Sequence, residues 1–149
     1  MIIRPVFPAD LDPLLAMVQA LTLHHNDQPL ITRASLNRDV FGTVPWFHVL
    51  VAEADDAALQ GYAALLPLAR LGYGQRGIDL HHLFVSEGHR NRGIGTALVN
   101  AALALARDLA CTYVIVGTHP ANHAAQAYYQ KLGFAAKGPS GIRFALTLS

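Results

Sequence analysis

Cysteine, charge and long apolar runs are all scarce in this chain of 149 residues. The single cysteine, Cys111, has no partner for an internal disulfide, which excludes a disulfide-stabilised scaffold and a cysteine-based zinc site. Lysine and arginine number 11 against 10 acidic residues, so no basic excess can neutralise a nucleic-acid backbone. No apolar run reaches the roughly 20 residues that a membrane-spanning helix needs. We therefore expect neither a nucleic-acid partner nor a membrane partner.

Hydrophobic residues, by contrast, are abundant at 52% of the chain, with 14% charged, which excludes a disordered protein. The length fits a single domain, since domains cluster at about 100–150 residues. The first residues, Met1–Pro5, lack the charged-then-apolar pattern of a signal peptide. The composition thus predicts a cytoplasmic protein with one domain over residues 1–149.

The spacing of apolar residues predicts an α/β (α+β) fold, in which a mixed central sheet is flanked by helices in the order βααβββαβαββ. The expected elements are strand Ile2–Val6, a helix capped by Asp10, a short helix from Thr32 to about Val40, strands Phe47–Glu53, Gly61–Leu68 and Ile78–Ser86, helix Thr96–Leu109, strand Thr112–Gly117, helix Asn122–Leu132, and closing strands Phe134–Ala136 and Ile142–Leu148. In a regular strand, alternation places His81 and His82 on opposite faces.

The most informative stretch is the turn between strand Ile78–Ser86 and helix Thr96–Leu109, which contains Gly93 and Gly95. Because glycine lacks Cβ, the backbone there can approach a ligand closely and adopt positive φ. The N-terminus of the following helix offers unpaired N–H groups and the positive end of its dipole, which suit a pyrophosphate. Arg90 adds charge-assisted hydrogen bonds, as does Arg92.

Two nucleotide-binding patterns fit this turn poorly. The Walker pattern needs a lysine after its last glycine, and this turn has none. The dinucleotide-binding pattern needs a third glycine and belongs to the first strand–helix turn, whereas this turn lies in the middle of the chain. A plain glycine turn with solvated arginines is the structural alternative.

The segment Arg90–Gly95 resembles the Arg/Gln-x-x-Gly-x-Gly/Ala signature of the GNAT superfamily of acetyl-CoA-dependent N-acetyltransferases. Downstream, Asn122–Phe134 is similar to the family's Asn-x-x-Ala-x-x-(aromatic)-Tyr-x-x-x-Gly-Phe segment. The order of elements also matches, so the resemblance covers almost the whole chain. A weaker similarity over residues 36–53 points to the diamine (spermidine/spermine, thialysine) acetyltransferase branch, which has two carboxylates where this chain has His81 and His82.

The resemblance implies that acetyl-CoA is the co-substrate and that a primary amine of a small molecule accepts the acetyl group directly in a ternary complex. It implies that the strand end pairs with the pantetheine arm, that the N–H of Phe84 or Val85 points at the thioester oxygen, and that Asn122 bonds the arm. The cofactor-binding residues expected on this basis are Leu83, Phe84, Val85, Arg90, Asn91, Arg92, Gly93, Ile94, Gly95, Thr96 and Asn122.

Two catalytic residues are expected. Tyr129 matches the family's general acid, and a phenol with an ordinary pKa near 10 keeps its proton at neutral pH. His81 occupies the position of a glutamate in the diamine branch, and an imidazole suits proton transfer near neutral pH. No helix carries a His-x-x-x-His pair with an acidic partner, so no metal is expected.

Acidic residues that could hold the distant ammonium groups of a long polyamine are few, which favours a small amine or an amino acid. Three other readings stay open: a catalytically inactive CoA-binding or regulatory module, a peptide N-terminal acetyltransferase, and a protein-interaction domain. Members of the family often dimerise, so a homodimer is compatible with the resemblance.

Overall fold

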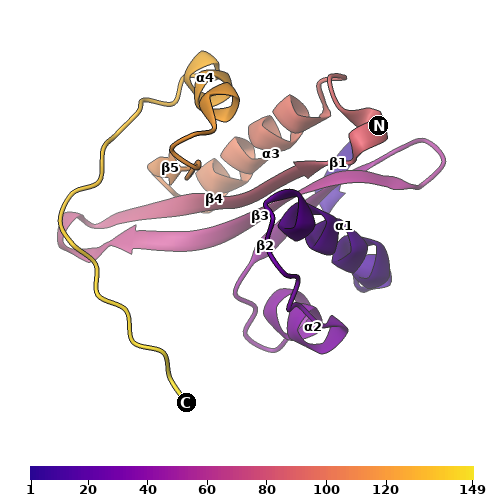
Figure 1. The fold of residues 1–149 in the computed structure, drawn as a ribbon, viewed down its shortest axis with the longest axis horizontal. Coiled ribbons are helices and arrows are strands. Elements are labelled where there is room, and N and C mark those ends of the chain that lie inside the picture. Colours follow the sequence, from indigo (N-terminus) through magenta and orange to yellow (C-terminus); the bar gives the residue numbers. More distant parts are fainter. The chain divides into compact units, whose positions relative to one another are not determined.

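The computed structural model describes residues 1–149, which form two compact units, Met1–Gly117 and Thr118–Ser149. The first unit is built on one five-stranded sheet with the strand order β1-β2-β3-β4-β5 (Figure 1). Its strands are β1 (Ile2–Pro5), β2 (His48–Glu53), β3 (Leu59–Arg70), β4 (Gln75–Val85) and β5 (Tyr113–Ile115). Its helices are α1 (Leu11–His24), α2 (Arg33–Phe41) and α3 (Ile94–Asp108). The second unit contains α4 (His123–Lys131).

Strand directions make the sheet mixed, as the sequence predicted. Neighbouring strands from β1 to β4 pair antiparallel, and β5 pairs parallel with β4. The helical connection through α3 makes this parallel pairing possible, because parallel neighbours need a long crossover. The fold class is confirmed.

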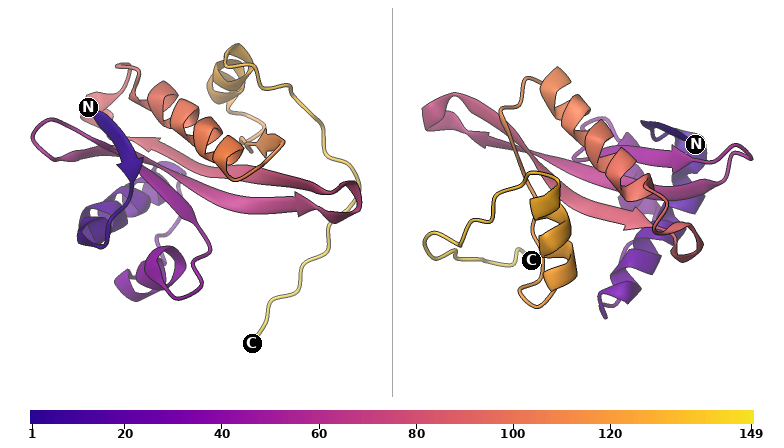
Figure 2. Two further views of the ribbon diagram at one scale, coloured as in Figure 1. Left: turned by 180° about the vertical axis from the view of Figure 1, so that it is seen from behind. Right: turned by 90° about the horizontal axis from the view of Figure 1, so that it is seen from above.

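Both faces of the sheet are apolar, because β2 and β3 contain runs of consecutive buried residues and successive side chains of a strand point to opposite sides. One face packs against α1 and α2 through a cluster made of Leu11, Leu14, Met17, Leu21, Leu36, Val49, Val51, Tyr62, Ala64 and Phe84. The other face is covered by α3, whose buried side chains include Leu98, Val99 and Ala102. Figures 1 and 2 show α3 and the α1–α2 pair on opposite sides of the sheet.

A β-bulge interrupts β4 at its centre. His82 lies opposite Ala64 and Leu80 lies opposite Leu65, so His81 has no partner of its own on β3. Two residues of the bulged strand therefore share one position, and both turn to the same side. The rings of His81 and His82 stack with centroids 4.5 Å apart and planes at 18°. The expectation that these histidines lie on opposite faces was wrong, because it assumed a regular strand.

The two expected closing strands do not form. Neither Phe134–Ala136 nor Ile142–Leu148 is a strand, and the chain after Gly133 has no regular element. The apolar residues that alternate in the last segment, Ile142, Phe144, Leu146 and Leu148, are 84–94% exposed. Alternation favours an extended conformation, but a strand also needs a hydrogen-bonded neighbour, and neither of these segments has one.

The ends of α2, α3 and α4 lie within two residues of the expected ones, and one of the two caps expected for α1 and α2 does not form. Thr32 caps α2 as expected, accepting a bond from the N–H of Ser35 at 3.0 Å. Asp10 precedes α1 but makes no capping bond, because its carboxylate accepts two bonds from the guanidinium of Arg4 (2.8 and 3.1 Å) and one from the N–H of Phe7. The hydrogen bonds from Arg4 hold the pKa of Asp10 below its usual value. None of the helices combines the length and apolarity needed to cross a bilayer.

Candidate active site

The glycine turn joins β4 to α3 through a 3-10 turn at Glu87–His89. Gly93 is the N-cap residue of α3 and has φ of 81°, a left-handed conformation that favours glycine. Gly95 lies inside α3 and has no positive φ, so the conformational argument applies to Gly93 alone. No side chain caps α3, and its first backbone bond runs from the N–H of Ala97 to the carbonyl of Gly93. The N–H groups of Ile94 and Gly95 therefore point out of the helix end.

Two arginines flank this helix end. Arg90 donates from Nε to the carbonyl oxygen of Val85 at 2.9 Å, which fixes its guanidinium beside the last residue of β4. Arg92 is exposed, directly before Gly93. Open N–H donors, a helix dipole and two cations make this turn fit an anionic group such as a pyrophosphate.

The outer edge of β4 is open along its second half, because β5 pairs only with Gly77, Ile78 and Asp79. The N–H of Ser86 donates to the carbonyl oxygen of Gln60 in β3 at 2.9 Å. Antiparallel ladders direct successive N–H groups to alternate sides, so Phe84 points its N–H toward β3 and Val85 points its own toward the open edge. Of the two donors expected for a thioester oxygen, this geometry favours Val85.

Both histidines of the bulge face the side of the sheet that carries α1 and α2. His81 is the more exposed, with 44% of its side chain accessible, and its Nδ1 lies 3.9 Å from the Asp79 carboxylate. His82 is half-buried, and its Nδ1 lies 3.0 Å from the hydroxyl of Tyr62. Burial lowers the pKa of His82 to about 4, and the charges of His81 and His25 add to this effect. No group of three or more His, Cys, Asp or Glu side chains is arranged to hold a metal ion.

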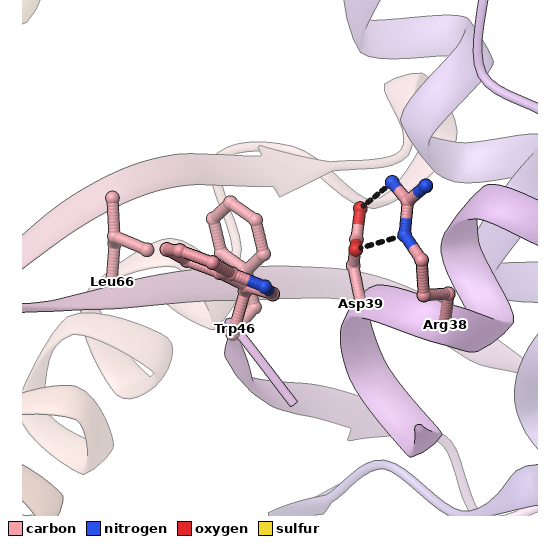
Figure 3. Close-up of a pocket in the computed structure, with 5 residues that line it drawn as sticks. Arg38, Asp39, Trp46 and Leu66 are labelled. Atoms are coloured by element: carbon pink, nitrogen blue, oxygen red, sulfur yellow. Dashed lines mark hydrogen bonds and ion pairs between the residues drawn. The ribbon is translucent and has the colours of Figure 1, made fainter. Parts of the chain in front are cut away.

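A pocket of about 440 Å³ opens on this side of the sheet (Figure 3). Its lining residues are Arg38, Asp39, Trp46, Phe47 and Leu66. The ring of Phe47 lies 5.3 Å from the ring of His81, so the expected base lies next to one lining residue of the pocket. Figure 3 shows Trp46 between Leu66 and the carboxylate of Asp39, and Trp46 is 66% exposed.

The polar end of the pocket is an ion pair between neighbours on α2. Arg38 donates from Nε and Nη2 to the two carboxylate oxygens of Asp39, at 2.8 and 3.0 Å. These bonds hold the pKa of Asp39 below its usual value, so it is ionised at neutral pH. The pocket therefore combines an apolar aromatic wall with a fixed negative charge and a cation.

The second unit carries two more of the predicted residues, Asn122 and Tyr129. Asn122 is the N-cap of α4, and its Oδ1 accepts a bond from the N–H of Ala125 at 3.1 Å. Tyr129 is half-buried, with its ring edge-on to those of Tyr128 and Phe134. Burial raises the pKa of Tyr129 to about 12, so its hydroxyl keeps its proton at neutral pH. Gly133 ends the helix with φ of 102°, as its position predicted.

Sequence reasoning missed the bulge partner Tyr62 and most of the pocket. From the sequence, Tyr62 is expected to be an aromatic core residue of a strand. Only the register of β3 against β4 brings its hydroxyl to His82. Trp46 and Phe47 follow a proline in the short connection before β2. The one signal that could have indicated the pocket is a tryptophan that the structure leaves exposed beside a strand.

Comparison with known proteins places these features in a family. The model of the acetyltransferase (GNAT) family matches residues 18–134. Human N-acetyltransferase 8 is 37% identical over 60% of this chain, which spans only 39% of that relative's length. The thialysine N-epsilon-acetyltransferase of Sus scrofa is 28% identical, covering 89% of this chain and 82% of the relative.

Solved structures agree on the fold. The ribosomal-protein-alanine N-acetyltransferase from Brucella melitensis superposes with a TM-score of 0.78 over 96% of this chain and 99% of the other, at 19% identity. The family's acyl donor is acetyl-CoA, and the open edge of β4 and the uncapped start of α3 suit its pantetheine arm and its pyrophosphate. The chain belongs to the acetyltransferase (GNAT) family.

Proposed function

We propose that this protein transfers the acetyl group of acetyl-CoA to a primary amine of a small molecule, with residues 1–149 acting as one acetyltransferase domain. The observation that carries the proposal is the arrangement at the end of β4. An unpaired strand edge, a left-handed Gly93 and an uncapped helix start follow one another in twelve residues, Val85–Thr96. Two histidines lie just before them, at the bulge of β4. The family match supports a single domain, because residues 18–134 run through both compact units.

The transfer needs an amine without its extra proton, a polarised carbonyl and a protonated leaving group. His81 takes a proton from the amine, while the amine nitrogen forms a bond to the thioester carbon and the carbon–sulfur bond breaks. The N–H of Val85 donates to the carbonyl oxygen, where negative charge grows in the transition state. Tyr129 gives its proton to the departing sulfur and regains one from solvent, and His81 returns its proton to solvent.

His81 suits the role of base better than His82 does. The side chain of His81 is 44% exposed, so it can exchange a proton with solvent, and its Nδ1 lies 3.9 Å from the carboxylate of Asp79. His82 has no carboxylate within ion-pair distance, and its pKa of about 4 makes it a weak base at neutral pH. The proposed base is therefore the histidine whose ring lies beside Phe47 of the pocket.

The pocket supports a small acceptor. A volume of about 440 Å³ falls within the range of about 300–1,000 Å³ that is typical of small-ligand sites. The exposed face of Trp46 can attract an ammonium group. The Asp39 carboxylate beside it is already paired with Arg38, so the pocket has no set of free carboxylates, and a small amine suits it better than a polyamine with several charges.

The test is a thiol-release assay with acetyl-CoA and four acceptors: a short diamine, an ω-amino acid, a long polyamine and a peptide with a free N-terminus. We expect saturable release with the short diamine or the ω-amino acid, and at most a tenth of that kcat/KM with the peptide. Release with the peptide alone would replace this proposal with peptide N-terminal acetylation. Calorimetric binding of acetyl-CoA without release from any amine would favour an inactive CoA-binding module.

Assembly and location stay predictions. The family resemblance is compatible with a homodimer in solution, and multi-angle light scattering of the purified chain at two concentrations measures its mass directly. A mass of 16.0 kDa at both concentrations would exclude the homodimer. The cytoplasmic location is tested by fractionation of the source cells.

A further inference from the structure

A buried tyrosine contacts the histidine pair from the neighbouring strand. Tyr62 of β3 is 1% exposed, and its hydroxyl lies 3.0 Å from Nδ1 of His82. Its burial raises the pKa of the phenol, so the hydroxyl carries its proton over the whole working range of pH. The Tyr62 hydroxyl has no other hydrogen-bond partner in the structure, so its O–H is the donor in this bond and Nδ1 of His82 is the acceptor.

This bond determines which nitrogen of His82 carries a proton. A neutral imidazole has one protonated and one bare nitrogen, so an accepting Nδ1 requires the proton to be on Nε2. The titratable groups that face His82 are Tyr62 from β3, His81 from its own strand and His25 from the end of α1. None of them is a carboxylate that would favour a second proton on the ring.

His81, which stacks on His82, does have a carboxylate nearby. His81 lies against His82 at 4.5 Å, is 44% exposed, borders the pocket through Phe47 and has Asp79 near its Nδ1. Two adjacent imidazoles on one face thus have different partners, a buried phenol for one and a carboxylate for the other. This difference in partners separates their chemistry.

We propose that Tyr62 is a positioning residue of the transfer: its hydroxyl holds His82 as a neutral imidazole with the proton on Nε2, so that the pair offers one hydrogen-bond donor and one base instead of two competing bases. The proposal rests on the proposed function in assigning the base to His81. The tautomer of His82 itself does not depend on any activity. Loss of the Tyr62 hydroxyl leaves Nδ1 without its donor, which frees the ring to change tautomer and to take up a proton.

The first experiment is ¹⁵N NMR of the histidine side chains in the full chain, with Tyr62→Phe compared with wild type. We expect His82 of the wild type to show a bare Nδ1 and a protonated Nε2, unchanged between pH 5.5 and 8. In Tyr62→Phe we expect a mixture of tautomers or a titration within that range. A protonated Nδ1 in the wild type, or an unchanged tautomer and titration in the variant, would overturn the proposal. Tyr73→Phe, which removes the hydroxyl of a tyrosine that is 81% exposed, is the matched control.

The second experiment measures turnover with an acceptor found in the panel above. We expect Tyr62→Phe to lower kcat about tenfold while the KM for acetyl-CoA changes less than twofold, since removing a hydrogen bond that orients a catalytic group acts on the chemical step. The expected tautomer change with an unaltered kcat would reject the catalytic part. Absence of turnover in the wild type would refute the proposed function and leave the tautomer result standing.

A second pair of variants serves if Tyr62→Phe does not fold. His82→Gln keeps an acceptor for the Tyr62 hydroxyl and an N–H donor, whereas His82→Phe keeps a ring of similar size and removes both. We expect His82→Gln to retain kcat within about threefold of the wild type and His82→Phe to lose about tenfold or more. Equal values for the two variants would reject a donor role for His82.

Discussion

At the scale of single residues, the proposed transfer depends on which groups hold a proton and which release one. Tyr129 and Tyr62 are both phenols whose pKa is raised by burial, and both keep their protons at neutral pH. In the proposed transfer, Tyr129 gives its proton to a thiolate, a base that forms only when the carbon–sulfur bond breaks. Tyr62 belongs to the core cluster and its hydroxyl is bonded to His82, so its proton serves to orient that ring.

Replacing Tyr129 with phenylalanine removes the proposed acid and leaves the size of the ring unchanged. We expect kcat to fall about 100-fold, the lower end of the usual contribution of general acid–base catalysis. The Kd of acetyl-CoA, measured by calorimetry, should stay within twofold of the wild-type value. Unchanged turnover would remove Tyr129 from the mechanism.

Replacing His81 with alanine tests the proposed base through pH. A base acts only when it is deprotonated, so kcat/KM of the wild type should fall on the acidic side of its profile. We expect His81→Ala to lower kcat/KM at neutral pH about 100-fold and to abolish this acidic limb. His24→Ala, an exposed histidine at the end of α1, should keep the wild-type profile. A retained acidic limb in His81→Ala would assign the base to another group.

At the scale of elements, the site depends on how β4 begins and ends. At its start, Gly77 lies opposite Tyr113 of β5, and a Cβ at this glycine would overlap the tyrosine ring. The guanidinium of Arg70 covers the same ring at 4.0 Å from its centroid. In the turn that follows its end, Gly93 takes the left-handed conformation that starts α3. One glycine makes room for β5 and the other turns the chain toward the expected pyrophosphate.

Gly77→Ala should destabilise the attachment of β5. The added methyl group must displace the Tyr113 ring, and we expect the free energy of unfolding to fall by about 1–3 kcal/mol, the usual cost of overpacking. Urea denaturation followed by circular dichroism measures this change. Gly72→Ala is the matched control, because a Cβ there meets no atom within 4 Å. Equal stabilities of the two variants would show that the Tyr113 ring adapts without cost.

Gly93→Val tests the turn. Its φ of 81° is strained for a β-branched residue, so we expect the start of α3 to shift and the Kd of acetyl-CoA to rise at least tenfold. Gly88→Ala, in the same connection but without positive φ and with no atom within 4 Å of its Cβ, should bind normally. Normal affinity in Gly93→Val would refute the phosphate-binding role of the turn.

At the scale of the whole molecule, the half-buried His82 links stability to pH. Its pKa in the folded state, about 4, lies below the ordinary 6.5 of the unfolded chain, so the unfolded state binds the proton more readily. The contribution of His82 to stability is therefore complete above pH 6.5 and is lost as the pH falls toward 4. The pKa of Asp10 is lowered as well, and its contribution is lost only below its ordinary value of 3.8.

We expect the free energy of unfolding to decrease between pH 7 and pH 4.5 with a slope of at most about 1.4 kcal/mol per pH unit from this one group. His82→Gln, which cannot take up a proton, should show a shallower dependence over the same range. Urea denaturation at four pH values measures both chains. Parallel curves for the two would show that His82 has the same pKa folded and unfolded.

Local sequence patterns predicted much of this fold, and most of what they missed depends on how the strands pair with one another. The order of elements up to α4, the Thr32 cap and the left-handed Gly93 follow from residues close together in the sequence. The bulge at His81 depends on the register against β3, and the choice of Val85 as donor depends on which edge of β4 lacks a neighbour. The alternation in Ile142–Leu148 predicts a strand but cannot supply its partner.

The extra residue in β4 also has an evolutionary consequence. If His81 were deleted, the remaining residues of β4 would return to a strict two-residue period, and each would keep the face that it has now. A single-codon insertion or deletion at this position can therefore add or remove the proposed proton acceptor without moving the core.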